Sequence, residues 1–178
     1  MDSIKDPIDQ NIERPRGYSF FAKLLHWGFV AIFAYGIYKQ VDNVSLLADS
    51  SLLRFEIIFA SGFLALLIVR FLYMRFTQKS SLPEGTGRFQ KLAAKVVHYG
   101  LYISFASIAA SGLIIGLLYQ FGIKEGLLID GVIGLHELSV TLSYYLIATH
   151  ILAAIYHRFL RDGVWNSMVP IWQERKET

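Results

Sequence analysis

The stretch HELSVTLSYYLIATHILAAIYH, residues 136–157, decides the fold of this chain. Glu137 is its only acidic residue, it contains no lysine or arginine, and three histidines are spaced along it. A helix rises about 1.5 Å per residue, so about 20 apolar residues are needed to cross roughly 30 Å of hydrocarbon. The stretch therefore predicts a membrane-spanning helix that carries histidines at membrane depth.

Three further apolar runs of similar length precede this one. Together they predict spans near residues 18–41, 53–74, 93–120 and 132–160. The chain has 178 residues, of which 54% are hydrophobic, and its mean hydropathy of +0.42 is too high for an ordinary soluble domain. We expect an all-α fold, an integral membrane four-helix bundle. The expected divisions are an N-terminal arm (1–17), the bundle (18–162) and a C-terminal tail (163–178).

The basic residues predict the orientation in the membrane. Fourteen of the seventeen Lys and Arg residues lie in the N-terminal region, the 70–95 connection and the tail, and only Lys39, Arg54 and Lys124 fall on the other side. Cytoplasmic flanks collect Lys and Arg, so we expect both termini in the cytoplasm and the protein in the bacterial inner membrane. We expect no cleavable signal peptide. No basic cluster is interleaved with aromatics, which argues against a nucleic-acid partner.

The absence of cysteine narrows the chemistry. It excludes disulfides, iron–sulfur clusters and the covalent attachment of a c-type haem. The sequence also contains no flavin or nucleotide motif, and we assign no catalytic residue. In the third span, Gly112 and Gly116 have the spacing G-x-x-x-G, which indicates close helix packing.

Helical geometry separates the histidines of span four into two levels. From His136 to His150 the helix turns about 40° less than four full turns, and from His150 to His157 it turns about 20° less than two full turns. All three histidines therefore share one face of the helix. The rise from His136 to His150 is roughly 21 Å. These two histidines therefore cannot bind one iron.

His26 and His150 lie at similar depth, roughly 12 and 15 Å from the inner ends of spans one and four. Histidine inside a span is a functional candidate and the commonest metal ligand. We predict that His26 and His150 are the axial ligands of a haem b held between the two helices. Gly62, and less strongly Gly28, is expected to let the macrocycle approach the backbone.

Three other basic side chains near the inner side have open roles. His98 could replace one of these ligands, donate a hydrogen bond to a haem propionate or line a quinone pocket. His157 is either a hydrated interfacial imidazole or a contact for a propionate or quinone. Arg70 is either an interfacial anchor that extends to water or a propionate partner.

Several short motifs together resemble the bacterial cytochrome b561 family, which is related to the cytochrome b subunits of nickel-iron hydrogenases and formate dehydrogenases. They are LLHW (24–27), IVR-x-L (68–72), VVHYGLY (96–102), GLHE (134–137), ATHILAAIYH (148–157) and D-x-x-x-x-S-M-V-P (162–170). The resemblance implies a four-helix membrane cytochrome that exchanges electrons with quinone. It also implies His26 and His150 as ligands of the inner haem.

The resemblance further implies an outer haem, held by a histidine near the start of span two and by His136. That first histidine is missing, because Glu56 stands at the expected place. We therefore expect one haem, with Glu56, His136 and Glu137 as an outer polar group that shuttles protons, caps the helix or fills the cavity. A second haem, five-coordinate on His136 or completed by another residue, is the alternative.

The leading functional hypothesis is an electron carrier between a redox partner, such as a dehydrogenase, or a small reductant and the quinone pool. A stand-alone superoxide:quinone oxidoreductase is a second hypothesis. A haem-free metal carrier that uses the histidine face of span four is a third, and a purely structural anchor is a fourth. The chain could act as a monomer or as a homodimer.

Overall fold

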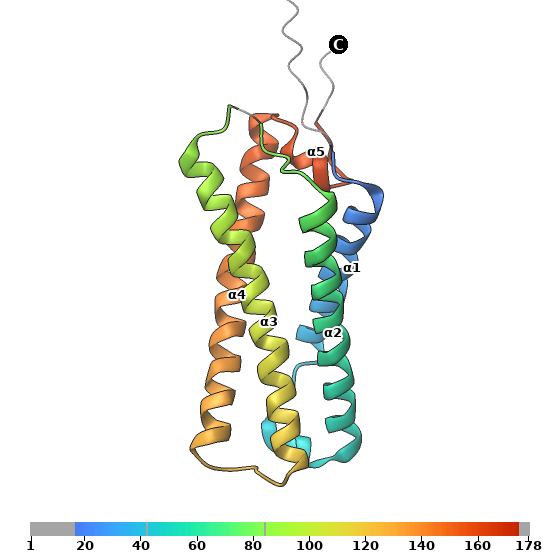
Figure 1. Cartoon of the computed structure of the whole chain (residues 1–178), viewed down its shortest axis with the longest axis vertical. Coiled ribbons are helices and arrows are strands. Elements are labelled where there is room, and N and C mark those ends of the chain that lie inside the picture. Colours follow the sequence, from blue (N-terminus) through green and yellow to red (C-terminus); the bar gives the residue numbers. More distant parts are fainter. Residues whose placement is uncertain (1–16, 42, 84, 175–178) are drawn as a thin grey trace, which may run out of the picture.

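The computed structural model describes residues 17–41, 43–83 and 85–174. These residues form four long helices that run side by side along the long axis of the molecule (Figure 1), and they contain no strand. All four are long and apolar enough to cross a membrane. The predicted all-α membrane bundle is confirmed. The elements are α1 (Phe20–Tyr38), η1 (Val44–Ala48), α2 (Ser50–Thr77), α3 (Arg88–Gln120), α4 (Leu127–Leu160) and α5 (Val164–Met168).

Helices α2, α3 and α4 begin three to five residues before the apolar runs that predicted them. Backbone hydrogen bonding continues past the hydrocarbon wherever the free N–H groups of the first turn find partners. At the start of α2, the Asp49 carboxylate accepts from the backbone N–H groups of Ser51 and Leu52. The hydroxyl and N–H of Ser51, together with the N–H of Leu52, hold the pKa of Asp49 below its usual range.

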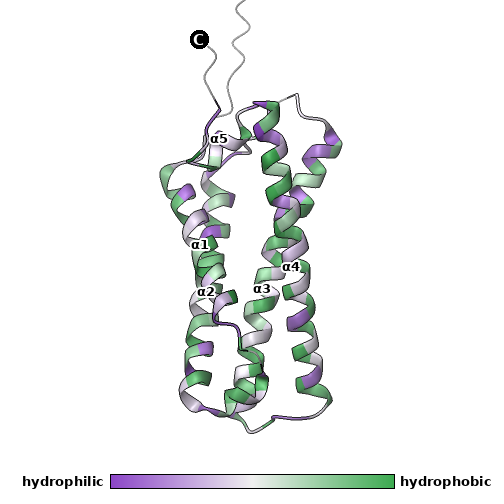
Figure 2. Ribbon diagram, turned by 180° about the vertical axis from the view of Figure 1, so that it is seen from behind, coloured by the Kyte–Doolittle hydropathy of each residue, from purple (hydrophilic) through white to green (hydrophobic). Residues whose placement is uncertain are grey.

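Hydrophobic residues, drawn in green in Figure 2, occur along the whole length of the four long helices. Large hydrophobic side chains such as Ile58, Ile103 and Leu152 are more than half exposed. Exposed apolar patches of this extent are unfavourable in water, whereas lipid is as apolar as the side chains themselves. The surface therefore fits a bilayer.

The core consists of two clusters. Phe29, Phe63 and Phe105 join α1, α2 and α3 in the first, with ring centroids 4.8 Å (Phe29–Phe63) and 5.1 Å (Phe29–Phe105) apart. The second lies near η1 and includes Tyr119 and the fully buried Ile129. Helix α3 packs on both α2 and α4, whereas α1 packs on α2 and makes almost no close backbone contact with α4. The halves of α1 and α4 that carry His26 and His150 are therefore connected through side chains.

The G-x-x-x-G pair lies at two helix contacts, one with α2 and one with α4. A Cβ at Gly116 would lie 2.7 Å from Cγ1 of Ile57 on α2, and a Cβ at Gly112 would lie 3.6 Å from Cε1 of His136 on α4. Gly116 in particular leaves no room for a side chain unless the Ile57 side chain or α2 itself moves.

We expect Gly116→Ala to lower the free energy of unfolding by about 1–3 kcal/mol, because overpacking forces the neighbouring helix away. Thermal unfolding of the detergent-solubilised protein measures this. Gly131→Ala in α4 is the matched control, since a Cβ there meets no atom within 4 Å, and it should leave stability unchanged or slightly raised. Equal melting of the two variants would contradict the close contact, whereas partial rescue of Gly116→Ala by Ile57→Ala would support it.

Candidate functional site

Each of the four long helices places one basic side chain at the same level of the bundle. His26 comes from α1, Arg70 from α2, His98 from α3 and His150 from α4. The ring centroids are 6.3 Å apart for His26 and His150 and 5.0 Å apart for His98 and His150, and Nη2 of Arg70 lies 2.8 Å from Nδ1 of His26. We call these four residues the inner cluster. Sequence reasoning placed all four in the inner half, and the structure brings them together.

The spacing between His26 and His150 suits a single metal ion between the two rings. An imidazole nitrogen binds a transition metal at about 2.0–2.1 Å and lies about 1.1 Å from its ring centre, so two rings on opposite sides of one ion have centroids roughly 6 Å apart. The observed separation is 6.3 Å, with the ring planes inclined at 56°. His98 is too close to His150, at 5.0 Å and edge to face, for an ion to fit between them in that way.

The hydrogen bonds of two rings define where their protons lie. Nδ1 of His98 is 2.6 Å from the carbonyl oxygen of Ala94, which can only accept, so Nδ1 donates and Nε2 keeps its lone pair. At His26 the pattern is reversed, because the Arg70 guanidinium can only donate, and Nδ1 of His26 therefore accepts. A metal-ligating histidine usually donates its second N–H. Binding of a metal by Nε2 of His26 would thus require Arg70 to release Nδ1.

Arg70 is a cation that forms no ion pair with any acidic side chain among the described residues. Its Nε is buried and has no hydrogen-bond partner in the part of the chain that the structure describes. The guanidinium carbon lies 5.6 Å from the ring centre of Phe29 and 5.3 Å from that of Tyr102. An unpaired charge in apolar surroundings is costly. The inner cluster therefore favours an anionic group beside Arg70.

His136 belongs to a separate contact between α3 and α4. The Ser111 hydroxyl donates to the carbonyl of Ser107 at 2.5 Å, so Nδ1 of His136, 3.0 Å away, donates to Ser111 Oγ. Ser107 and Ser139 are joined by a hydrogen bond of 2.8 Å between their hydroxyls. Sequence reasoning missed this polar seam. Serines at i and i+4 on both helices, at 107 and 111 and at 139 and 143, were a signal that could have indicated it.

Glu56 is half-buried on α2 and lies within electrostatic range of Lys39. No interaction joins Glu56 to His136 in the described residues. Nor do any three His, Cys, Asp or Glu side chains within those residues gather as a metal-ion site. The structure thus provides no second imidazole for the level of His136.

His157 pairs with the residues that follow α4. Its Nδ1 lies 2.5 Å from Oδ2 of Asp162, and the neighbouring Arg158 donates to the carbonyl of Trp172 at 2.7 Å. Trp27 of α1 donates from Nε1 to the carbonyl of Met168 at 3.2 Å. These bonds hold α5 and the described part of the tail against the N-terminal half of α1 and the C-terminal end of α4 (Figure 1). His157 therefore lies in the last turn of α4, outside the inner cluster.

Gly28 and Gly62, which the sequence suggested as places where a haem macrocycle could approach the backbone, are not needed for contacts within the protein. A Cβ at Gly28 or Gly62 would meet nothing within 4 Å.

The four helices form a bundle, and the first and the last helix present imidazoles at one depth. This arrangement is typical of the class of membrane-bound cytochromes that hold haem within a helix bundle. A family model described as prokaryotic cytochrome b561 matches residues 17–170, so the chain belongs to the prokaryotic cytochrome b561 family. The family resemblance of the sequence motifs is confirmed. Membership implies a multi-pass, electron-transferring b-type cytochrome of a kind that typically binds haem b. Comparison with curated proteins and with solved structures gives no match.

Proposed function

We propose that this protein carries single electrons between a redox partner or small reductant and the quinone pool by means of one haem b, with His26 and His150 as axial ligands. The observation that carries the proposal is the 6.3 Å separation of the two rings, which come from α1 and α4 at one level. When bound, the haem supplies reversible one-electron chemistry, and two imidazole ligands suit that role.

The remaining members of the inner cluster support haem binding in different ways. Arg70, with its unpartnered Nε, would pair with a propionate carboxylate, because guanidinium and carboxylate form strong charge-assisted hydrogen bonds. His98 is a positioning residue in this proposal. Its edge-to-face contact at 5.0 Å limits the orientation of the His150 ring, and its own ring is fixed by the bond to Ala94.

We propose one haem per chain because the outer level lacks the means to hold a second. His136 is hydrogen-bonded to Ser111 and lies against Gly112, and Glu56 replaces the imidazole expected on α2. A carboxylate is a poor ligand for a low-spin haem compared with imidazole.

Pyridine haemochrome analysis of the pure protein should therefore give one haem per polypeptide. Protein concentration from amino-acid analysis makes the ratio absolute. The His136→Ala variant is the control, and it should give the same ratio because His136 binds no haem in this proposal. Two haems in the unchanged protein, falling to one in His136→Ala, would show that an outer haem exists.

The two electron-transfer hypotheses separate in a simple assay. A generic carrier needs a dehydrogenase or other donor, whereas a superoxide:quinone oxidoreductase reduces a quinone analogue when purified protein is supplied with superoxide alone. We favour the carrier, because no feature of the described residues specifies superoxide. One chain supplies both proposed ligands, so haem binding needs no homodimer. We propose the bacterial inner membrane, with both termini cytoplasmic, which C-terminal reporter fusions check.

A further inference from the structure

The residues that follow α4 fold back on themselves as a small unit, residues 162–174, which we call the tail loop. The carboxylate of Glu174 accepts from the backbone N–H of Gly163 at 2.9 Å, and the N–H of Glu174 donates to the Asn166 side chain at 2.8 Å. The indole of Trp165 donates to a carbonyl within the same segment at 3.0 Å. These bonds close the loop, so it can transmit a constraint from one helix to another.

One side of the tail loop is attached to α4. Nε of Arg158 donates to the carbonyl of Trp172 at 2.7 Å, and Nη2 donates to the carbonyl of Gln173 at 3.3 Å. The guanidinium carbon also lies 4.7 Å from the centre of the Trp172 ring, which is a distance typical of a cation–π contact. His157 and Asp162 add a bond of 2.5 Å where the helix ends. Side chains therefore hold the loop to α4 in addition to the chain connection.

The other side of the tail loop is attached to α1 and the residues just before it. The last carbonyl groups of a helix have no partner within that helix, and two of those in α5 accept from this part of the chain. The carbonyl of Ser167 accepts from the backbone N–H of Tyr18 at 3.2 Å. The carbonyl of Met168 accepts from Nε1 of Trp27, also at 3.2 Å. The tail loop therefore bridges α1 and α4 (Figure 1).

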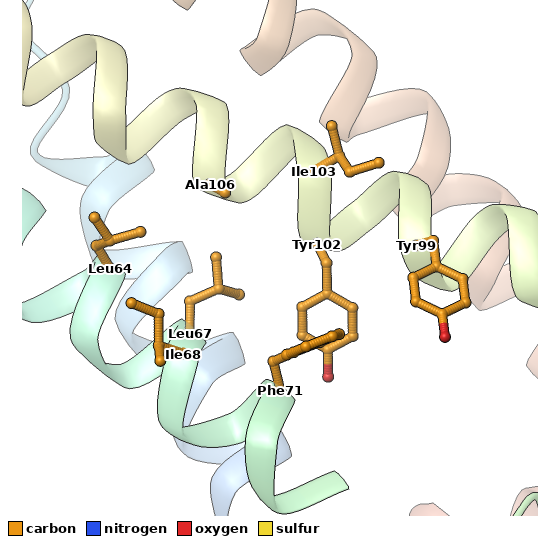
Figure 3. Close-up of a pocket in the computed structure, with 8 residues that line it drawn as sticks. All are labelled: Leu64, Leu67, Ile68, Phe71, Tyr99, Tyr102, Ile103 and Ala106. Atoms are coloured by element: carbon orange, nitrogen blue, oxygen red, sulfur yellow. The ribbon is translucent and has the colours of Figure 1, made fainter. Parts of the chain in front are cut away.

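This bridge joins two helices that otherwise have little direct contact. Helices α2 and α3 pack on each other through side chains such as Phe71 and Tyr102, whose ring centroids are 5.1 Å apart (Figure 3). Helices α1 and α4 make almost no close backbone contact, although they carry His26 and His150. A porphyrin between these two rings would also keep the helices apart, so their spacing has to be set elsewhere in the fold.

The residue that joins α1 to the tail loop is also a neighbour of a proposed haem ligand. The rings of Trp27 and His26 meet edge to face, with centroids 5.5 Å apart and planes inclined at 88°. The hydrogen bond to Met168 fixes the far edge of the indole. Rotation of the His26 ring toward Trp27 is therefore limited by a side chain that the tail loop holds in place.

We propose that the tail loop is a clasp that sets the separation of α1 and α4 and the orientation of the His26 ring, with Trp27 as a positioning residue. Ligands held in their binding geometry before haem enters need little further ordering, and groups outside the first shell commonly provide that order. The inference rests on the proposed ligation by His26 and His150. A tail loop that only covered the helix ends would affect stability and leave the ligand geometry unchanged.

Two substitutions in the full-length, haem-loaded protein open the clasp from opposite sides. Trp27→Phe keeps an aromatic ring beside His26 but loses the N–H donor, and Arg158→Met loses both bonds to the tail loop. Each should speed the transfer of haem to an excess of a haem-scavenging globin about twofold to tenfold, the effect of one or two hydrogen bonds. Each should also broaden the largest g-value signal of the ferric low-spin haem in electron paramagnetic resonance, because the His26 ring samples more orientations.

Tyr73→Phe is the matched control. It removes a hydroxyl that is hydrogen-bonded at 2.9 Å to Ser19, the N-cap of α1, but this bond joins α1 to α2 and not to the tail loop. Haem transfer and the resonance spectrum should therefore be unchanged. The double variant Trp27→Phe/Arg158→Met should lose haem about as fast as the faster single variant, because either change opens the same clasp. Rate increases that multiply would mean two independent contacts and would overturn the clasp.

The ligand variants distinguish the failure of this inference from the failure of the proposed function. The clasp alone is wrong if His26→Ala and His150→Ala abolish the low-spin spectrum while Trp27→Phe and Arg158→Met only lower the melting temperature, with haem transfer and resonance spectrum unchanged. If His26→Ala keeps a normal low-spin spectrum, the ligand assignment is wrong, and the clasp fails with it.

Discussion

The His150→Ala protein is expected to lack the low-spin b-type haem spectrum entirely, and the His26→Ala protein likewise. Each substitution removes one of two imidazoles whose centroids are 6.3 Å apart, and the nearby His98 lies 5.0 Å from His150, too close for an iron to fit between those two rings. A haem left with one axial ligand and a cavity in place of the other binds weakly and changes spin state. The reduced-minus-oxidised optical spectrum, normalised to protein, measures the loss.

Two further variants serve as controls, because they remove histidines that are not proposed as haem ligands. His136→Ala should retain the full spectrum, because His136 contacts Ser111 at the outer level. His98→Ala should retain a low-spin haem with altered band positions, because it removes a neighbour of His150 and no ligand. If His98→Ala lost all haem while His26→Ala kept it, His98 would be the partner of His150. Normal low-spin spectra in both His26→Ala and His150→Ala would refute the assignment altogether.

The Arg70→Met protein is expected to bind haem roughly a hundredfold to several thousandfold more weakly. In the proposed site the guanidinium pairs with a propionate, and removal of one partner from a buried ion pair costs about 3–5 kcal/mol because the other charge remains unpaired. Arg70→Lys keeps the charge but loses the two-pronged geometry, so an intermediate affinity is expected. Titration of haem into the haem-depleted protein in detergent measures the dissociation constants.

In the haem-depleted protein the same substitution is expected to affect stability, if at all, in the favourable direction. Without haem, Arg70 is a cation with a buried Nε that lacks a partner, so Arg70→Met should leave the unfolding temperature of this form unchanged or raise it. A purely structural role for Arg70, through its contacts with Phe29 and Tyr102, predicts the reverse. A fall in stability of the haem-depleted variant with unchanged haem affinity would therefore assign Arg70 to packing.

Much of the fold was predictable because its determinants are local. Apolar runs long enough to cross the hydrocarbon predicted the four long helices that the structure shows. The predicted bounds differed from the observed ones by only a few residues, because caps such as Asp49 extend a helix beyond the hydrocarbon. Rise per residue likewise placed His26 and His150 at one level. These inferences need only the geometry of a single helix.

The pairing of side chains across helices depended on the tertiary structure. The sequence alone allowed either His26 or His98 to lie opposite His150 across an iron. In the structure the ring centroid of His150 is 6.3 Å from that of His26 and 5.0 Å from that of His98, and only the longer distance leaves room for an iron. Arg70 could have extended to water, yet it contacts His26.

By itself, the sequence determined that this chain forms four membrane helices with imidazoles at two depths, since length, hydropathy and helical rise are properties of each segment alone. The rotation and separation of those helices were decided only in the folded bundle. They depend on contacts between distant residues, such as Gly116 against Ile57 and Phe29 against Phe105, which bring α3 close to α2 and α1. Side-chain volume at these contacts fixes which histidine faces which, and no periodicity along one helix contains that information.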